Sequence, residues 1–222
     1  MAAKLYPVIQ EHLAFVHPGA ARSIFWEIDS ATAREIERAG DPGFEKEAWL
    51  TTTILNYGCC GYSIATPHPD DPGLPVKVLA TVLYCGRDDA PGSTQLPTAP
   101  VSEDAELISS LFIEPEHASD GMAAVLLDAA IMELVRKDVS AVEAFGLRED
   151  HHLDPDSPRA ETVQDIVGRR EQIGLLPEPV LESAGFEVVR DHPVLPRLRL
   201  ELPPNSALLT AEAVEQLLAR TQ

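Results

Sequence analysis

The stretch that indicates the fold most strongly runs from Leu107 to Ala130 and reads LISSLFIEPEHASDGMAAVLLDAA. Its apolar first part, ended by Pro115, is typical of a strand, because proline cannot donate a hydrogen bond to a sheet. After a polar turn, residues 121–137 are apolar nearly all round and close with basic side chains, which the helix dipole favours at that end. The stretch therefore predicts a strand, a glycine turn and a buried helix.

The neighbouring segments extend this pattern on both sides. Residues 59–66 and 76–86 are rich in β-branched and aromatic side chains, and the loop HPDDPGLP between them predicts an antiparallel pair. Residues 139–147 read as a strand that follows the buried helix, which implies a right-handed parallel crossover. Before these strands, residues 30–40 and 43–58 show helical spacing and each ends in glycine.

The C-terminal part is less regular. Residues 148–179 depart from the alternation and read as an insertion, in which Ser157 and Pro158 begin one amphipathic helix over 159–174. Residues 5–28 support no assignment. The remaining expected elements are a short helix at 178–185, strands at 186–193 and 196–202, and a last helix at Ala211–Ala219 that either docks on the body of the protein or mediates association, for example as a homodimer.

The charge of the chain restricts its partners. Seventeen Lys and Arg against 36 Asp and Glu give a net charge of −19, which repels nucleic acid and anionic membrane surfaces. The same charge either attracts a cationic amine or basic protein, or is simply a solvated surface, which is the more common case. Three cysteines without a ligand pattern, no apolar run of about 20 residues and no leader-like N-terminus favour a cytoplasmic protein.

This order of elements resembles the GNAT acetyltransferase family over about residues 45–202. The most specific pieces are the stretch 107–130, SAVEAFGL at 140–147 and LESAGFEVVRDHP at 181–193. The resemblance implies an α/β (α+β) fold with a mixed, mostly antiparallel sheet of six to seven strands flanked by helices, and a parallel crossover after the cofactor turn. It also implies a single domain over 1–222, with core 45–202, insertion 148–179 and a C-terminal helix within 207–222.

The turn between the strand and the buried helix fills the family's pattern of Pro-Glu, any residue, Arg or Gln, two residues, Gly, any residue, and Gly or Ala. Main-chain N–H groups at such a helix start suit a pyrophosphate, so the resemblance implies acetyl-CoA (or CoA) as the ligand. Ala118 and Asp120 depart from the pattern, and a lost charge-assisted hydrogen bond is worth about 1.5–3 kcal/mol. The implied cofactor-binding residues are Leu111, Phe112, Ile113, Ala118, Ser119, Asp120, Gly121, Met122 and Ala123.

The groups that would move protons are harder to place. Leu181 stands where many members of the family have a tyrosine that acts as the general acid, so the general acid of this chain is unassigned. Glu106 is a weak candidate for the base, because strand alternation puts it on the face opposite Leu107 unless a bulge shifts the phase. Other titratable candidates, each more typical of a structural role, are Tyr62, Tyr84, His117 and His192.

Two further clusters have simple interpretations. His151 and His152 beside acidic residues are more typical of a polar loop than of a metal site, so no metal is expected. Arg197 and Arg199 share one face of a strand and either meet an acidic group of the substrate or coenzyme, or form cross-strand ion pairs, which is the more common role.

The resemblance implies acetyl transfer from acetyl-CoA to a primary amine, on a small molecule or a protein, by direct attack. The oxyanion would meet a main-chain N–H near Phe112 or Ile113. The alternative is a GNAT-fold pseudoenzyme that acts as a binding or regulatory protein, since Ala118, Asp120 and Leu181 all depart from the family's pattern. A weaker third reading is a scaffold whose acidic surface recruits a basic protein.

Overall fold

A computed structural model of the chain describes residues 3–71, 73–118, 120–149, 153–204, 208–209 and 211–219. Its core is one eight-stranded sheet in the order β1–β2–β3–β4–β5–β8–β7, with β6 beside β5. Neighbouring strands are antiparallel, except that β4 and β6 run parallel to β5. The strands are β1 (Lys4–Pro7), β2 (Gly61–Pro67), β3 (Pro75–Cys85), β4 (Ala105–Ile113), β5 (Ala141–Leu147), β6 (Leu176–Pro177), β7 (Glu187–Arg190) and β8 (Arg197–Glu201).

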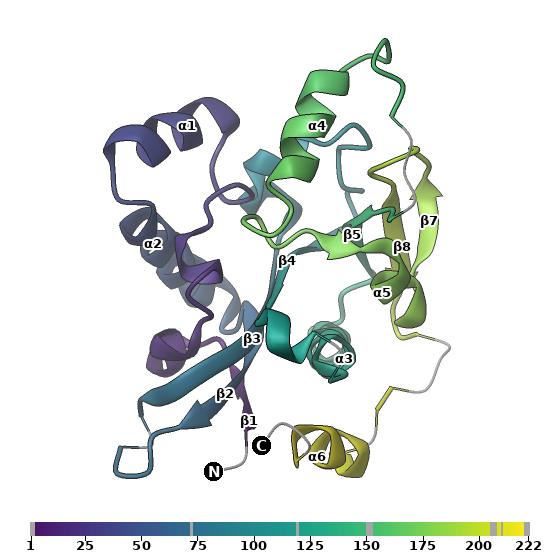
Figure 1. Cartoon of the computed structure of the whole chain (residues 1–222). Helices are drawn as coiled ribbons and strands as arrows, with labels where there is room; N and C mark the ends of the chain where they lie inside the picture. The colour runs from purple at the N-terminus through teal and green to yellow at the C-terminus, as the bar shows by residue number, and fades with distance from the viewer. Residues whose placement is uncertain are drawn as a thin grey trace.

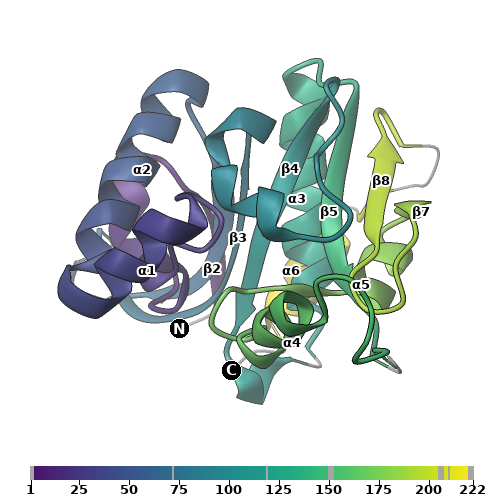
Figure 2. The same ribbon diagram turned by 90° about the horizontal axis from the view of Figure 1, so that it is seen from above.

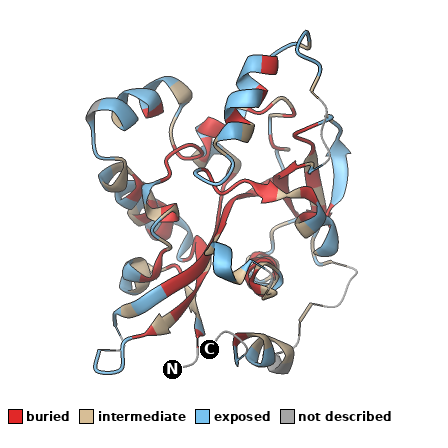
Figure 3. Cartoon of the chain, viewed as in Figure 1, coloured by how far each residue is buried: buried red, intermediate tan, exposed pale blue. Residues whose placement is uncertain are grey.

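The helices cover both faces of this sheet. Figure 1 shows α1 and α2 on one side and α3 and α6 on the other. Seen from above, β4 and β5 run through the middle of the molecule (Figure 2), and the buried residues concentrate there while β7 is exposed (Figure 3). The α-helices are α1 (Ser30–Ala39), α2 (Pro42–Tyr57), α3 (Met122–Arg136), α4 (Ala160–Gly168), α5 (Glu178–Ser183) and α6 (Ala211–Ala219), and short 3-10 turns lie at Gln10–Phe15, Ala20–Arg22, Arg87–Asp89, Pro91–Gln95 and Pro115–His117.

The predicted fold class is confirmed. The sheet is mixed and mostly antiparallel, it is flanked by helices, and β4, α3 and β5 form the parallel crossover. The sheet has eight strands where six to seven were expected. The strands without a counterpart in the predicted elements are β1, most of which lies in the unassigned residues 5–28, and β6, which lies in the insertion. The C-terminal helix docks on α3, because its Leu218 shares a core with residues of α3. Just before this helix, the Leu209 N–H donates to Asp128 Oδ2 of α3 at 2.6 Å.

The expected helix over 159–174 is wrong in both its start and its length. Arg159 has a positive φ of 66° and precedes the helix, so Ser157 and Pro158 form a turn before α4 instead of capping it. The helix stops at Gly168, and residues 169–174 close tight turns that end at Gly174, with φ 62°. The helical spacing extends to Ile173, but this side chain is buried in the core from a loop.

A β-bulge lies in the middle of β4. Leu83 of β3 pairs with Ser110 and Tyr84 pairs with Ile108, so Ser109 is an extra residue with no partner in the register. The bulge shifts the alternation: Ile108 and Leu111 both pack in the core beneath α3, whereas Phe112 packs on the opposite face with residues of α2. The shift that could alter the face of Glu106 therefore exists, but it lies after Glu106 in the strand.

The paired part of β4 and β5 is short. Only Ala105–Ile108 pair with Ala141–Ala144, and the two strands then separate. Residues 169–177, here called the strap, fill the inner end of the gap. On one side the Leu111 N–H donates to Gly174 O at 2.8 Å, and on the other side Leu176 and Pro177 pair with β5.

The strap is also held from α2's side of the sheet. The Trp26 indole Nε1–H donates to Ile173 O at 2.7 Å, in fully buried surroundings. Ile173 and Leu176 are themselves 0% exposed. The inner end of the gap is thus closed by the chain's own backbone.

Replacing Trp26 by phenylalanine should leave the buried Ile173 carbonyl without its donor and lower the free energy of unfolding by about 1–3 kcal/mol. Urea unfolding measures this change. Trp49→Phe is the matched control, because the Trp49 indole donates at 2.9 Å to Asp89 O, away from the strap. Hydrogen exchange at the Leu111 amide should accelerate in Trp26→Phe alone; equal acceleration in both variants contradicts the anchoring role of Trp26.

Candidate functional site

A cavity of about 830 Å³ lies where β4 and β5 have separated, beyond the strap. Its volume falls in the range of small-molecule sites, about 300–1,000 Å³. Its walls come from the end of β4, the N-terminal segment, the end of β5, the strap and the start of α3. Of the residues predicted from sequence to bind the cofactor, the cavity brings together Leu111, Phe112, Ile113, Ala118 and Ala123.

The register of β4 decides which main-chain groups face this cavity. The Glu114 N–H donates to Leu79 O of β3, and in an antiparallel pair the groups facing one neighbour alternate along the strand. The N–H groups of Leu111 and Ile113 therefore point away from β3, into the gap. Gly174 O already accepts from Leu111, so Ile113 carries the N–H that remains for a ligand.

The turn after β4 uses much of its own hydrogen-bonding capacity. The N–H of His117 donates to Glu114 O at 2.9 Å, that of Ala118 to Pro115 O at 3.4 Å, and that of Asp120 to His117 O at 3.1 Å. These groups close 3-10 turns and do not converge on a common point. The phosphate contacts stay a prediction, and these three N–H groups of the turn are already engaged, while Ser119 lies outside the described residues.

The start of α3 carries no capping side chain from the described residues. Gly121, with φ 78°, is its N-cap and contributes no side-chain hydrogen bond, so the first N–H groups of the helix have no capping side chain. Ala123 lines the cavity, whereas Met122 is 2% exposed and packs in the core. Asp120 is held by His117, whose Nδ1 lies 2.9 Å from Asp120 Oδ2.

Charged side chains line the other walls. Arg148 donates through Nε to both oxygens of Glu178 and forms an ion pair with Asp191 at 2.9 Å. Within the described part of the chain, the side chain of Arg170 in the strap makes two long contacts, both at 3.4 Å, to Val167 O and to the neighbouring Glu171. The residues that line the cavity from the turn and from α3, Pro115, Ala118 and Ala123, carry no charge, so the predicted phosphate contacts there would rest on main-chain groups.

His17 lines this cavity with its imidazole ring. Its Nδ1 accepts from the Gly19 N–H at 3.1 Å, which puts the proton of the neutral ring on Nε2, 2.9 Å from Glu114 Oε1. Burial lowers the pKa of His17, while Glu114 opposes that shift. Sequence reasoning missed His17: it lies in the unassigned segment 5–28, where the only signal was the turn VHPGAA.

The residues considered from sequence for the role of general acid do not line the cavity. Leu181 is 0% exposed in the apolar core beneath α3. Tyr84 is buried and its hydroxyl has no partner among the described residues, while burial raises the pKa of Tyr62 to about 12. His117 is held by Asp120, and the Nδ1 of His192 accepts from the N–H groups of two following residues.

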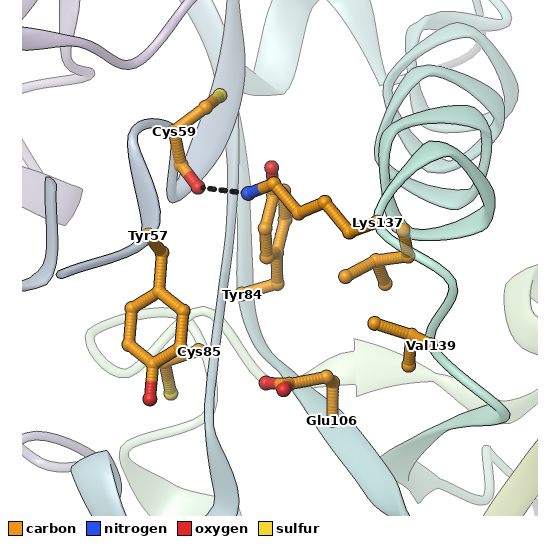
Figure 4. Close-up of a pocket in the computed structure, with 8 residues that line it drawn as sticks. Tyr57, Cys59, Tyr84, Cys85, Glu106, Lys137 and Val139 are labelled. Atoms are coloured by element: carbon orange, nitrogen blue, oxygen red, sulfur yellow. Dashed lines mark hydrogen bonds between the residues drawn. The ribbon is translucent and has the colours of Figure 1, made fainter.

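Glu106 lies in a different, much smaller pocket, shown in Figure 4 with Tyr57, Tyr84 and Lys137 around it. Burial raises the pKa of Glu106, and the Asp89 carboxylate adds to that rise. Leu111 lies five positions after Glu106 in the strand, which corresponds to about 17 Å at about 3.4 Å per residue. Its role as a base stays a prediction, and the structure brings it near no part of the cavity wall.

The remaining clusters are also placed. Arg197 and Arg199 lie at 2.9 and 3.4 Å from the carboxylate of Glu143, which is 0% exposed, so they form the cross-strand ion pairs. His151 and His152 lie outside the described residues, and within the described ranges no three metal-ligating side chains gather. Within those ranges, too, no helix has the length and apolar character to span a membrane.

No family model matches this chain, and no curated protein sequence does. Solved structures resemble it at low identity. PaiA N-acetyltransferase from Thermoplasma acidophilum, solved with coenzyme A, is 12% identical, with 90% of this chain and 99% of that chain covered and a TM-score of 0.48. Ribosomal-protein-S18-alanine N-acetyltransferase from Escherichia coli is 11% identical (94% and 99% covered, TM-score 0.46), and the GNAT domain of S. lividans PAT is 15% identical (90% and 90%, 0.45).

Two of these proteins are N-acetyltransferases by name and the third is a GNAT domain, the class that the sequence resembles. With TM-scores below 0.5 and identities of 15% or less, the likenesses carry no information on the reaction or substrate of this chain.

The pH dependence of stability should report on His17. Because its pKa is lowered in the folded state, the unfolded chain binds its proton first as pH falls, and this contribution to stability, complete above the ordinary value of 6.5, is lost below it. Urea midpoints at pH 7.5 and pH 5.5 should therefore differ more in the wild type than in His17→Gln. The carboxylates are common to both proteins, so an equal pH dependence contradicts the assignment.

Proposed function

We propose that the chain is a GNAT-type N-acetyltransferase that moves an acetyl group from acetyl-CoA to a primary amine. The observation that carries this proposal is the cavity between the separated strands, with the Ile113 N–H in its wall and the uncapped start of α3 at one end. A polar donor within an apolar gap suits a thioester carbonyl, and a helix start suits a phosphate.

The residues present fit the coenzyme in part. The cavity is large enough, and Ala118 and Ala123 leave the backbone at the α3 end accessible. Ile113 is the residue of β4 that offers a main-chain donor, since Leu111 already donates to the strap. When bound, the coenzyme supplies an activated acyl group. The missing basic side chains at the α3 end predict weaker binding than in a site with an arginine there.

Acetyl transfer forms a C–N bond and breaks the thioester C–S bond; the amine nitrogen loses a proton and the thiolate sulfur gains one. In this chain the Ile113 N–H is placed to stabilise negative charge on the carbonyl oxygen. Leu181 cannot act as a general acid. The protons would therefore be transferred by water or by the titratable groups that line the cavity, His17 and Glu149 or Glu171. The negative net charge favours a cationic acceptor, on a small molecule or a protein.

A second candidate is a GNAT-fold protein without acetyl transfer that acts as a binding or regulatory protein. Three features favour it: the Leu111 N–H is taken by Gly174, the turn N–H groups close on themselves, and Leu181 is buried in the core. Calorimetric titration with acetyl-CoA separates the two candidates. Binding at micromolar concentration, followed by thiol release with a panel of amines, supports the enzyme; no heat at millimolar ligand removes it.

Ala118→Arg should tighten coenzyme A binding by about tenfold or more, because a charge-assisted hydrogen bond to phosphate is worth about 1.5–3 kcal/mol. Ala118 is exposed and lines the cavity at the α3 end. The combined variant with Asp120→Arg should gain further, since it also removes a carboxylate. Isothermal calorimetry gives the dissociation constants.

Ala124→Arg is the matched control. Ala124 is exposed and lies in the first turn of α3, but it does not line the cavity. It adds the same charge to the same helix, so it should gain far less. Equal gains at 118 and 124 would mean that the effect is long-range charge, and no gain at 118 would place the phosphates elsewhere.

A further inference from the structure

The ring of Phe112 is enclosed in a way that only glycine neighbours allow. A Cβ on Gly174 would lie 2.5 Å from Phe112 Cε2, and one on Gly19 would lie 2.9 Å from Phe112 Cδ1. Such contacts are too short for carbon atoms, so the ring is fitted between two backbones that lack side chains. The His17 ring stacks near it, with centroids 5.8 Å apart and planes 18° apart.

The two glycines belong to segments that are themselves fixed. Gly174 is in the strap, whose carbonyl accepts from Leu111 and whose neighbour Ile173 accepts from Trp26. Gly19 donates to His17 Nδ1, and the His17 N–H donates to Thr81 Oγ1 of β3 at 2.9 Å. Phe112 is 5% exposed, with the core that contains Leu50 and Leu83 behind it. The ring therefore forms a rigid part of the cavity wall.

The position of this ring bears on any acyl group. The next residue, Ile113, carries the N–H that points into the cavity. The preceding N–H on the same side of β4, that of Leu111, donates to the strap, which closes the gap there. A carbonyl that accepts from Ile113 would lie beside the strap and the Phe112 ring, which line the same cavity. Neither wall can retreat without breaking the contacts just described.

We propose that Phe112, clamped between Gly19 and Gly174, sets the size of the acyl group that this cavity accepts and restricts it to the smallest acyl chains. The inference rests on the proposed function, because it concerns the acyl donor of that reaction. It assigns a specificity role to a side chain, whereas the role expected for Phe112 from sequence concerned its main chain alone.

The test compares dissociation constants of acetyl-CoA and butyryl-CoA by calorimetry. Butyryl adds two methylenes, worth about 0.8 kcal/mol each when buried, or about tenfold in affinity together. Phe112→Leu should open space toward the Leu50 side and shift the butyryl-to-acetyl ratio in favour of butyryl by about tenfold. Phe15→Leu is the control: Phe15 is 1% exposed, stacks on Tyr6 and does not line the cavity.

Gly19→Ala provides a second variant that acts in the opposite direction. Gly19 has φ −63°, which alanine adopts without strain, and its new methyl would crowd the ring of Phe112 and narrow the cavity that both residues line. The ratio should then move further in favour of acetyl. This variant keeps the inference testable if Phe112→Leu does not fold.

The outcomes distinguish the two proposals. If the wild type binds neither coenzyme A nor its acyl forms, the proposed function and the inference both fall. If the wild type binds them and the ratio is unchanged in Phe112→Leu and in Gly19→Ala, only the role of Phe112 falls. A shift equal to that in Phe15→Leu also overturns it, because general loosening of the core would then be the cause.

Discussion

The separation of β4 from β5 is the constraint on which the site depends. Two strands that part after four paired residues leave main-chain N–H and C=O groups facing a gap, and such groups are costly to bury without partners. The chain meets part of this need with the strap, through the bond between the Leu111 N–H and Gly174 O. The strap leaves the main-chain N–H of Ile113 for a ligand, and this donor makes the gap a candidate site.

Much of the architecture could be predicted from sequence because it follows from local patterns. The paired strands before Pro115, the glycine turn and the buried helix α3 each have a signal within a few residues, and the crossover hand follows from general rules. The prediction of a helix over 159–174 was wrong although its helical periodicity was real. The tertiary contacts of Ile173 and Gly174 decided the backbone there.

The site was less predictable, because its parts come from distant segments. Leu111, Phe112, Ile113, Ala118 and Ala123 were placed from one continuous stretch, and they do line the cavity. His17, Gly19 and Gly174 reach Phe112 from more than 60 residues away in the chain, and no local spacing reports such a meeting. The loss of the Leu111 donor to the strap was equally hidden, since a main-chain hydrogen bond leaves no mark on residue type.

The bulge at Ser109 makes β4, in effect, two short strands joined out of phase. Before it, the side chains of odd-numbered residues face α2's side of the sheet; after it, those of even-numbered residues do. If the same residues alternated without the bulge, Phe112 would turn toward α3 and Leu111 toward α2. The bulge therefore decides which face each of these side chains takes, and anyone grafting this sequence onto another sheet must carry the irregularity with it.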